Sequence, residues 1–407
     1  MKRIVLLFSL SLFAAILTAQ TMKIHRGQIA VALALSEVGQ MNYADNGATL
    51  QIAGTGYAVE EIDSIVVVPG TVDPLSVEVC YAGNLAFVTA SADVVSALKL
   101  DVKGADVQVW ADASLQEEVT YSLSGESSDG SFFMEGEYKS TLVLDGLTLS
   151  NKRGAAIDIA NGKRLNVVLT DGTVNTLSDG AGGTHDACFF VNGHPEFSGA
   201  GSLILTGNTK HAFASDEYTQ LKPGTGRIEV KGAVNDGLHI KQYFLMQGGE
   251  VVVNGTAGDC IDVSITKDPL DEKNGQIIVE AGSLTLDVAA DDKKGMKCDD
   301  SMTISGGTIK ANVSGDGTKG LSVGTDLLIQ QKTEVPTRIE MTVTGTTYMP
   351  DDPELESKCR GIKVKGNFVF DGGDIKISAT GKKSKAISVD GTYTYKSGTI
   401  NCYVDAN

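Results

Sequence analysis

Gly237-Leu238-His239-Ile240 is followed 23 residues later by Cys260-Ile261-Asp262-Val263, and the same pattern recurs along the second half of the chain. Each copy begins with a small residue and, in nearly every case, then alternates apolar and polar side chains. The other copies are Ala212-Phe213-Ala214-Ser215, Gly295-Met296-Lys297-Cys298, Gly320-Leu321-Ser322-Val323, Gly361-Ile362-Lys363-Val364 and Ala386-Ile387-Ser388-Val389. Alternation with a period of two indicates short β-strands.

The spacing of these copies predicts how the strands are arranged. Successive first positions are 25, 23, 35, 25, 41 and 25 residues apart, and the two long steps contain insertions at 266–274 and 346–358. Each period also carries a second strand after a glycine turn, as in Gly306-Gly307 before Thr308-Ile309. Such short strands bury their apolar sides only by stacking on the turns above and below. A β-sandwich would not keep one register across these insertions, so we expect an all-β, right-handed parallel β-helix (a β-solenoid).

The first part of the chain differs from the repeat. A basic start at 1–3, an apolar run from Ile4 to Leu17 and small residues before Gln20 are typical of a cleaved signal peptide at 1–19. No second long apolar run follows, so we expect an exported protein without a transmembrane anchor, located in the periplasm, at the cell surface or outside the cell. Residues 20–104 lack the register and predict a small β-rich N-terminal region or cap, whereas residues 105–407 form the β-helix.

Charge and cysteine content exclude some functions. The formal net charge is −17, which repels phosphate backbones and argues against a nucleic-acid partner. The six cysteines are widely spaced and form no C-x-x-C pair, which argues against a zinc site. Their spacing leaves disulfides and buried free thiols both open.

A column of basic residues is the first candidate site. Lys294, Lys319, Arg360 and Lys385 each precede the small residue of a repeat, so the β-helix places them on neighbouring turns, and Lys297 and Lys363 lie close by. Like charges side by side across strands are unfavourable unless something offsets them. A bound polyanion such as a uronic-acid polysaccharide would do so. The alternative is a solvated lysine edge whose counter-ions come from the insertions.

A group of acidic residues is the second candidate. Asp236, Asp259 and Asp262 are expected on adjacent turns, with Asp299 on the next. Calcium takes several oxygen ligands, which carboxylates and turn carbonyls supply, so these four residues are candidate calcium ligands. The alternative is that they pair with Lys294 and Lys297.

A pair of aromatic residues is the third candidate. Tyr218 follows Phe213 by five residues and Tyr243 follows Leu238 by five, so the two tyrosines share a register one turn apart. Aromatic faces bind sugar rings, but stacked tyrosines also stabilise neighbouring turns by packing alone.

Several short motifs resemble a bacterial family of carbohydrate-binding parallel β-helices whose best-known members come from cellulose-degrading bacteria. The motifs are SLSGESSDG at 122–130, YK at 138–139, KR at 163–164, HPEFSG at 194–199 and NDG at 235–237. The resemblance covers about residues 105–404 and implies a pectate-lyase-like fold, calcium binding, and binding of acidic plant polysaccharides and cellulose without clear lyase activity. The N-terminal part is similar to leaders of Bacteroidetes surface proteins.

These observations predict a secreted, non-catalytic protein that binds extracellular polysaccharide, an anionic one first of all. The first alternative is a calcium-dependent polysaccharide lyase of the pectate-lyase type, with Lys294 or Lys297 as the base. The chain lacks the G-H-G and R-I-K segments that we associate with β-helix lyases and polygalacturonases, so no catalytic residue is predicted. The second alternative is a structural or adhesive surface protein. The sequence leaves the oligomeric state open.

Overall fold

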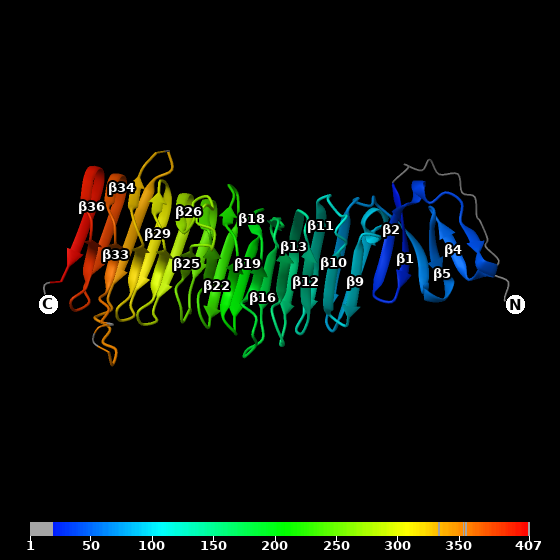
Figure 1. Cartoon of the computed structure of the whole chain (residues 1–407), viewed down its shortest axis with the longest axis horizontal. Coiled ribbons are helices and arrows are strands. Elements are labelled where there is room, and N and C mark those ends of the chain that lie inside the picture. The colour runs from blue at the N-terminus through cyan, green and yellow to red at the C-terminus, as the bar shows by residue number, and fades with distance from the viewer. Residues whose placement is uncertain (1–18, 333, 353, 355, 406–407) are drawn as a thin grey trace.

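The computed structural model describes residues 19–405 except 333, 353 and 355, and it shows an elongated molecule with the N-terminal and C-terminal parts at opposite ends (Figure 1). The predicted signal peptide lies outside the described residues except for Ala19. Nearly all regular structure is β-strand, which confirms the all-β prediction. The described helices are α1 (Ala92–Val95) and the 3₁₀ turns η1 (Leu35–Glu37), η2 (Asp45–Gly47) and η3 (Val59–Glu61). None of the helices in this part of the chain has the length and hydrophobicity to cross a membrane.

One long sheet runs along the whole repeat region. Its neighbouring strands pair in parallel, apart from the first pair, β9 with β10, which is antiparallel. We call it the twelve-stranded sheet, and its strands are β9 (Leu98–Lys103), β10 (Asp106–Ala111), β12 (Ser131–Gly136), β14 (Ile157–Asn161), β17 (Ala187–Val191), β20 (His211–Ser215), β23 (Leu238–Lys241), β25 (Ile261–Ser264), β27 (Lys294–Cys298), β30 (Lys319–Val323), β33 (Arg360–Val364) and β35 (Lys385–Val389).

The remaining strands of the repeat region belong to a second, 21-stranded sheet. In chain order they are β11 (Val119–Ser127), β13 (Ser140–Ser150), β15 (Arg164–Leu169), β16 (Val174–Ser178), β18 (His194–Ser198), β19 (Ser202–Gly207), β21 (Thr219–Leu221), β22 (Arg227–Ala233), β24 (Tyr243–Val253), β26 (Gln276–Val288), β28 (Met302–Ile304), β29 (Gly307–Val313), β31 (Leu327–Gln330), β32 (Thr337–Val343), β34 (Phe368–Ala379) and β36 (Tyr393–Val404).

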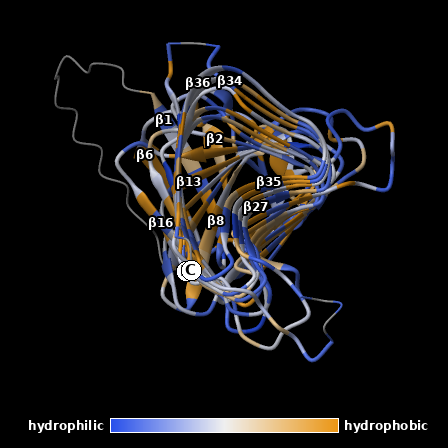
Figure 2. Ribbon diagram, turned by 90° about the vertical axis from the view of Figure 1, so that its left-hand side faces the viewer, coloured by the Kyte–Doolittle hydropathy of each residue, from blue (hydrophilic) through white to orange (hydrophobic). Residues whose placement is uncertain are grey.

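Strand pairing shows that each turn of the chain stacks on the next. Strands β27, β28 and β29 follow one another along the chain and pair in parallel with β30, β31 and β32, respectively. Viewed along the long axis, successive turns overlie one another around a common interior (Figure 2). The backbone of each strand hydrogen-bonds to the parallel strand of the next turn, and the chain reaches that strand by going round the turn and not through a hairpin.

The register across the insertions is as predicted. His239 lies opposite Asp262, and Asp262 lies opposite Lys297 although the insertion at 266–274 separates them in sequence. The second insertion, at 346–358, likewise leaves Ser322 opposite Lys363. Both insertions lie in the connections before β26 and before β33, so they do not disturb the ladders.

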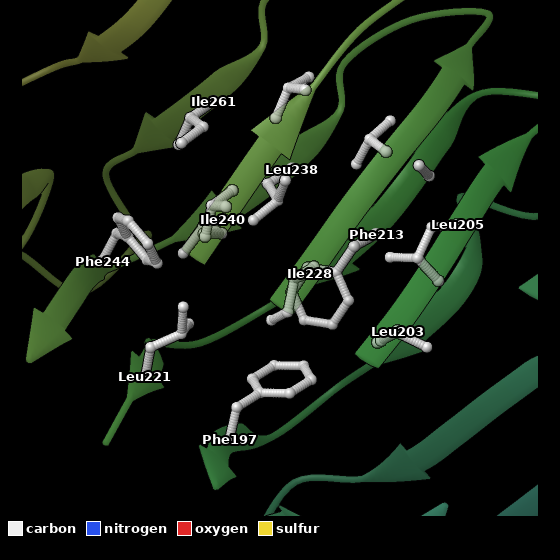
Figure 3. Packing of buried hydrophobic residues seen from close by; sticks show 14 of the residues in the cluster. Phe197, Leu203, Leu205, Phe213, Leu221, Ile228, Leu238, Ile240, Phe244 and Ile261 are labelled. Atoms are coloured by element: carbon white, nitrogen blue, oxygen red, sulfur yellow. The ribbon is translucent and has the colours of Figure 1, made fainter. Parts of the chain in front are cut away.

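The interior is filled by the apolar residues one and three places after each small residue. Leu238 and Ile240, for example, are at most 2% exposed. Phe189, Phe197 and Phe213 form an aromatic cluster, with ring centroids of Phe213 5.5 Å from Phe189 and 5.6 Å from Phe197 in edge-to-face geometry. Figure 3 shows Phe197 and Phe213 among leucines and isoleucines of the same and following turns. Burying one such side chain stabilises the fold by about 1.5–3 kcal/mol.

Two positions show why the turns require particular residues. A Cβ atom at Gly320 would lie 2.6 Å from the carbonyl oxygen of Gly361 on the next turn, so the small residue of the repeat allows close approach of the backbones. Asn175 is fully buried; its Oδ1 accepts a hydrogen bond from the Leu147 N–H at 2.8 Å, and its Nδ2 donates one to the Ser202 carbonyl at 3.2 Å. One amide thereby joins three turns.

Residues before the repeat form a β-rich region that adjoins the first turn. Strand β7 pairs in parallel with β11, and buried residues of β7 and β8 extend the main core. A second small core contains Met22, Ile24, Leu33, Ile52 and Tyr57. The strands are β1 (Gln20–Arg26), β2 (Ile29–Ala34), β3 (Asn42–Ala44), β4 (Thr49–Ile52), β5 (Thr55–Ala58), β6 (Ser64–Pro69), β7 (Ser76–Ala82) and β8 (Leu85–Ser91).

Candidate functional site

The outward face of the twelve-stranded sheet carries the predicted polar residues in one continuous column. Position two after the small residue points outward on every turn, because positions one and three point into the core. From β23 to β35 this column reads His239, Asp262, Lys297, Ser322, Lys363 and Ser388. The column therefore brings three candidate residues, Asp262, Lys297 and Lys363, onto one face.

A chain of ionisable groups crosses the middle of this face. The Nδ1 atom of His211, in β20, lies 3.2 Å from Asp236 Oδ2. The Nδ1 atom of His239 lies 3.2 Å from the same Asp236 oxygen and 3.1 Å from Asp262 Oδ2. Asp262 Oδ1 then accepts a hydrogen bond from Lys297 Nζ at 2.7 Å. Acidic and basic side chains thus alternate across four neighbouring strands.

Burial and pairing shift the pKa values in this chain. Burial alone would lower the pKa of His239, but its hydrogen bonds to Asp236 and Asp262 outweigh that effect and raise the pKa to about 9. Burial lowers the pKa of His211, which the neighbouring His239 lowers further. Burial opposes ionisation of Lys297, yet the hydrogen bond to Asp262 raises its pKa. Hence His239 and Lys297 are cations at neutral pH, and His211 is uncharged.

The four predicted calcium ligands do not converge on one point. Asp236 Oδ1 accepts the Asp259 N–H at 2.8 Å, and Asp259 Oδ1 accepts the Lys294 N–H at 2.8 Å. Asp299 is exposed and directly follows β27, whereas Asp259 lies two residues before β25, level with Lys294 at the start of β27. Five residues of strand separate these two levels, or roughly 16 Å at about 3.3 Å per residue. Asp299 therefore lies apart from Asp236, Asp259 and Asp262, which accept hydrogen bonds or form ion pairs, so the four together do not form one oxygen cage of the kind calcium takes.

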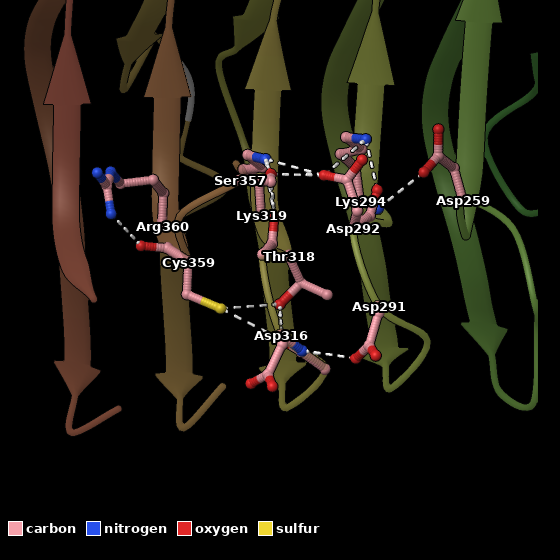
Figure 4. A network of polar contacts seen from close by, with 12 residues as sticks. Asp259, Asp291, Asp292, Lys294, Asp316, Thr318, Lys319, Ser357, Cys359 and Arg360 are labelled. Atoms are coloured by element: carbon pink, nitrogen blue, oxygen red, sulfur yellow. Dashed lines mark hydrogen bonds and ion pairs between the residues drawn. The ribbon is translucent and has the colours of Figure 1, made fainter. Parts of the chain in front are cut away.

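The first two members of the basic column do not point freely into solvent. Lys294 lies opposite Lys319, as predicted, but both ammonium groups turn toward Asp292 (Figure 4). Lys294 Nζ donates to the Asp292 carbonyl at 2.6 Å, and Lys319 Nζ lies 3.3 Å from Asp292 Oδ1 and also binds Ser357. One carboxylate from the turn before β27 offsets both charges, so the counter-ion comes from that turn and not from the insertions at 266–274 and 346–358, as the alternative had it.

The last members of the column differ from one another. Arg360 is buried, with its Nη1 donating to the Cys359 carbonyl at 2.6 Å, so its guanidinium supports the backbone. Lys363 pairs with Asp390. Lys385 is exposed, as is Lys365 at the far end of β33, and neither has an ion-pair partner within the described residues. We call Lys363, Lys365, Lys382, Lys383 and Lys385 the lysine patch; these residues lie in or beside β33 and β35, the last two strands of the twelve-stranded sheet.

The predicted tyrosine pair is stacked, but its faces are occupied. The ring centroids of Tyr218 and Tyr243 lie 4.7 Å apart, and the rings are nearly parallel. The His194 ring stacks on the other face of Tyr218, with a centroid distance of 4.7 Å. Lys273 Nζ lies 5.0 Å from the Tyr243 ring centroid. This arrangement fits the packing role better than an open platform for a sugar ring.

His211 and His239 were not predicted as site residues. They belong to different columns of the repeat, one directly before the small residue and the other two places after it. The register shows which residues lie on neighbouring turns, but it does not show the direction in which each side chain points. The sequence therefore did not predict that the side chains of His211 and His239 both turn toward Asp236. The sequence did carry a signal: two of the five histidines fall on adjacent turns. His211 occupies the same repeat position as Asp236 one turn earlier, and His239 follows Asp236 by three residues.

Comparison with known proteins places this geometry in a family. Residues 103–405 match the model of the family described as "Carbohydrate-binding domain-containing protein". Because that match covers most of the chain, the protein belongs to this carbohydrate-binding domain family.

Two individual proteins resemble parts of the chain. A carbohydrate-binding domain-containing protein of Acetivibrio thermocellus is 27% identical over 135 residues, which make up 33% of this chain and 41% of the relative. The chain therefore matches about two-fifths of that relative's length. A solved structure described as a polysaccharide lyase-like protein from C. thermocellum, in a gadolinium derivative, has a TM-score of 0.50 and 19% identity, and the match covers 62% of this chain and 96% of that one. At that identity the likeness concerns the fold alone.

Proposed function

We propose that the protein is a secreted, non-catalytic binding protein for anionic extracellular polysaccharide, and that the outward face of the twelve-stranded sheet is its binding surface. Family membership supports carbohydrate as the ligand class. We further infer that residues 105–405 form a right-handed parallel β-helix with a pectate-lyase-like fold. The parallel pairing of successive turns supports this inference.

The observation that carries the anionic preference is the lysine patch. The protein has a net charge of −17, and most of its charged side chains on this sheet are paired. Lys365, Lys382, Lys383 and Lys385 are exposed, and none of them has an ion-pair partner in the described ranges. Exposed cations that a strongly acidic protein leaves unpaired are suited to the carboxylates of a uronic-acid chain. Their spread over adjacent turns fits an extended polymer.

Calcium enters this proposal as an ion that bridges exposed carboxylates, such as Asp299, to those of the glycan. A bridging ion needs oxygen ligands from both partners and does not require the closed cage that the aspartates fail to form. This role predicts that calcium strengthens binding of acidic polymers and has no effect on neutral ones.

Two groups on this face bear on the lyase alternative. A lyase base must carry a free lone pair at the working pH. Lys297 has a raised pKa and is held by Asp262, while Lys294 donates to the Asp292 carbonyl. These contacts favour binding over proton abstraction.

The test is retention of the mature protein on polygalacturonate, alginate, cellulose and a neutral glucan, before and after EDTA treatment, with calcium added back. We expect retention on the two uronic-acid polymers that weakens with added salt. Release of unsaturated oligosaccharides from polygalacturonate would instead establish a lyase. Absence of retention on all four polymers would favour the structural or adhesive alternative.

A further inference from the structure

Three donor atoms converge at the middle of the outward face of the twelve-stranded sheet. Asp236 Oδ2 lies 3.2 Å from His211 Nδ1 and 3.2 Å from His239 Nδ1, and the three ligand atoms all lie within 4.8 Å of one another. Among the residues that the structure describes, no other set of three or more His, Cys, Asp or Glu side chains brings its donor atoms this close together. It lies on the face proposed to bind polysaccharide but uses none of the residues of the lysine patch.

A fourth donor lies beside the group. Asp262 Oδ2 is 3.1 Å from His239 Nδ1, on the side of the ring that faces the next turn. Donor atoms at zinc bond lengths of about 2.0–2.1 Å in a tetrahedron are separated by roughly 3.3–3.4 Å. The distances from Asp236 Oδ2 to the two histidine nitrogens, 3.2 Å each, are close to that spacing, whereas Asp262 Oδ2 contacts only His239 Nδ1 and lies outside the group of three mutually close donors.

The surroundings suit a metal ion rather than a solvated cluster. His211 is 1% exposed, Asp236 7% and Asp262 6%, so three of the four donors are held in the fold. His211 is the first residue of β20, His239 lies in β23 and Asp262 in β25, so regular strands fix three of the four backbones. The imidazole rings of His211 and His239 are stacked with centroids 4.3 Å apart, and both Nδ1 atoms face the same carboxylate.

We propose that His211, Asp236 and His239 form a binding site for a zinc-like divalent transition metal, with the neighbouring Asp262 carboxylate moving in as a fourth ligand when the ion binds. Two imidazole nitrogens and two carboxylate oxygens suit zinc and its first-row neighbours, whereas calcium prefers six to eight oxygens. The cysteine spacing argued against zinc in the sequence, but this site uses no cysteine.

The experiment uses the mature full-length protein, freed of metal with a chelator and dialysed against zinc chloride or calcium chloride. We expect one tightly bound zinc per chain by elemental analysis, no calcium retained at this site, and a higher Tm with zinc than with calcium at equal concentration. Cobalt(II) should give the visible absorption of a tetrahedral site with nitrogen and oxygen ligands. Weak binding of zinc no tighter than that of calcium would overturn the proposal.

Variants assign the metal to these residues. His239→Gln and Asp236→Asn should lose the bound zinc and the cobalt spectrum, while His194→Gln, a histidine change on another part of the surface, should keep both. Zinc retained in full by folded His239→Gln would refute the site. If a variant does not fold, imidazole ¹⁵N resonances of the unaltered protein give the answer: zinc must shift the signals of His211 and His239 and leave that of His194 unchanged. Equal shifts of all three signals, or none, would contradict the proposal.

Discussion

Replacement of Phe213 by alanine should destabilise the centre of the stack more than most single substitutions. Phe213 is 1% exposed and meets Phe189 and Phe197 edge to face at 5.5 and 5.6 Å. Truncating a buried phenylalanine costs about 3–5 kcal/mol in transfer and cavity free energy. Each edge-to-face pair contributes about 0.5–1.5 kcal/mol beyond burial, so we expect a loss near the top of that range, about 5 kcal/mol.

The assay is equilibrium urea unfolding followed by far-ultraviolet circular dichroism. Phe213→Leu keeps most of the apolar volume and loses the ring pairs, so it should cost about 1–2 kcal/mol. Phe87→Ala is the matched control, because Phe87 is 46% exposed on β8 and its truncation should change stability by no more than about 0.5 kcal/mol. A loss below about 2 kcal/mol for Phe213→Ala, or an equal loss for the leucine and alanine variants, would refute this account of the core.

Three further predictions concern hydrogen bonding, backbone spacing and thiols. Asn175→Ala removes the side-chain partner of the Leu147 N–H and of the Ser202 carbonyl, so it should lower the free energy of unfolding by about 2–3 kcal/mol. The control Asn312→Ala, at an exposed position, should have little effect. Equal urea midpoints for the two variants would contradict this prediction. Gly320→Ala should lower the Tm, because the new Cβ atom would lie 2.6 Å from the carbonyl oxygen of Gly361 on the next turn. An unchanged Tm would show that the two turns can move apart without a cost in free energy. A thiol reagent should modify Cys80 and Cys402 in the native protein and all six cysteines only after unfolding; rapid native reaction of more than two would mean that the buried thiols are accessible.

The register was predictable from the sequence because small residues mark it. The small-apolar-polar-apolar pattern placed Lys294, Lys319, Arg360 and Lys385 on adjacent turns, and the strand pairing agrees. Insertions did not obscure the pattern, because the chain leaves and rejoins the sheets at the same level.

The direction of the side chains was not predictable in the same way. Register alone did not show that Asp292 draws in Lys294 and Lys319, or that the Arg360 guanidinium turns to a carbonyl. It also suggested a common cluster for aspartates that occupy different levels of the strands, as Asp299 does. Long side chains choose among several partners within reach, and that choice depends on burial and on groups from other turns.

The central claim is tested most directly by comparing affinity for polygalacturonate between two charge-reversal variants. Lys365→Glu with Lys385→Glu alters the lysine patch, while Lys231→Glu with Lys310→Glu makes the same change of net charge at exposed positions of the 21-stranded sheet. At about 0.3–0.5 kcal/mol for each unit of exposed charge, the first variant should bind roughly tenfold more weakly than the second. Equal affinities for the two variants, or equal binding of the unaltered protein to a neutral glucan, would contradict the assignment of this face to an anionic polysaccharide.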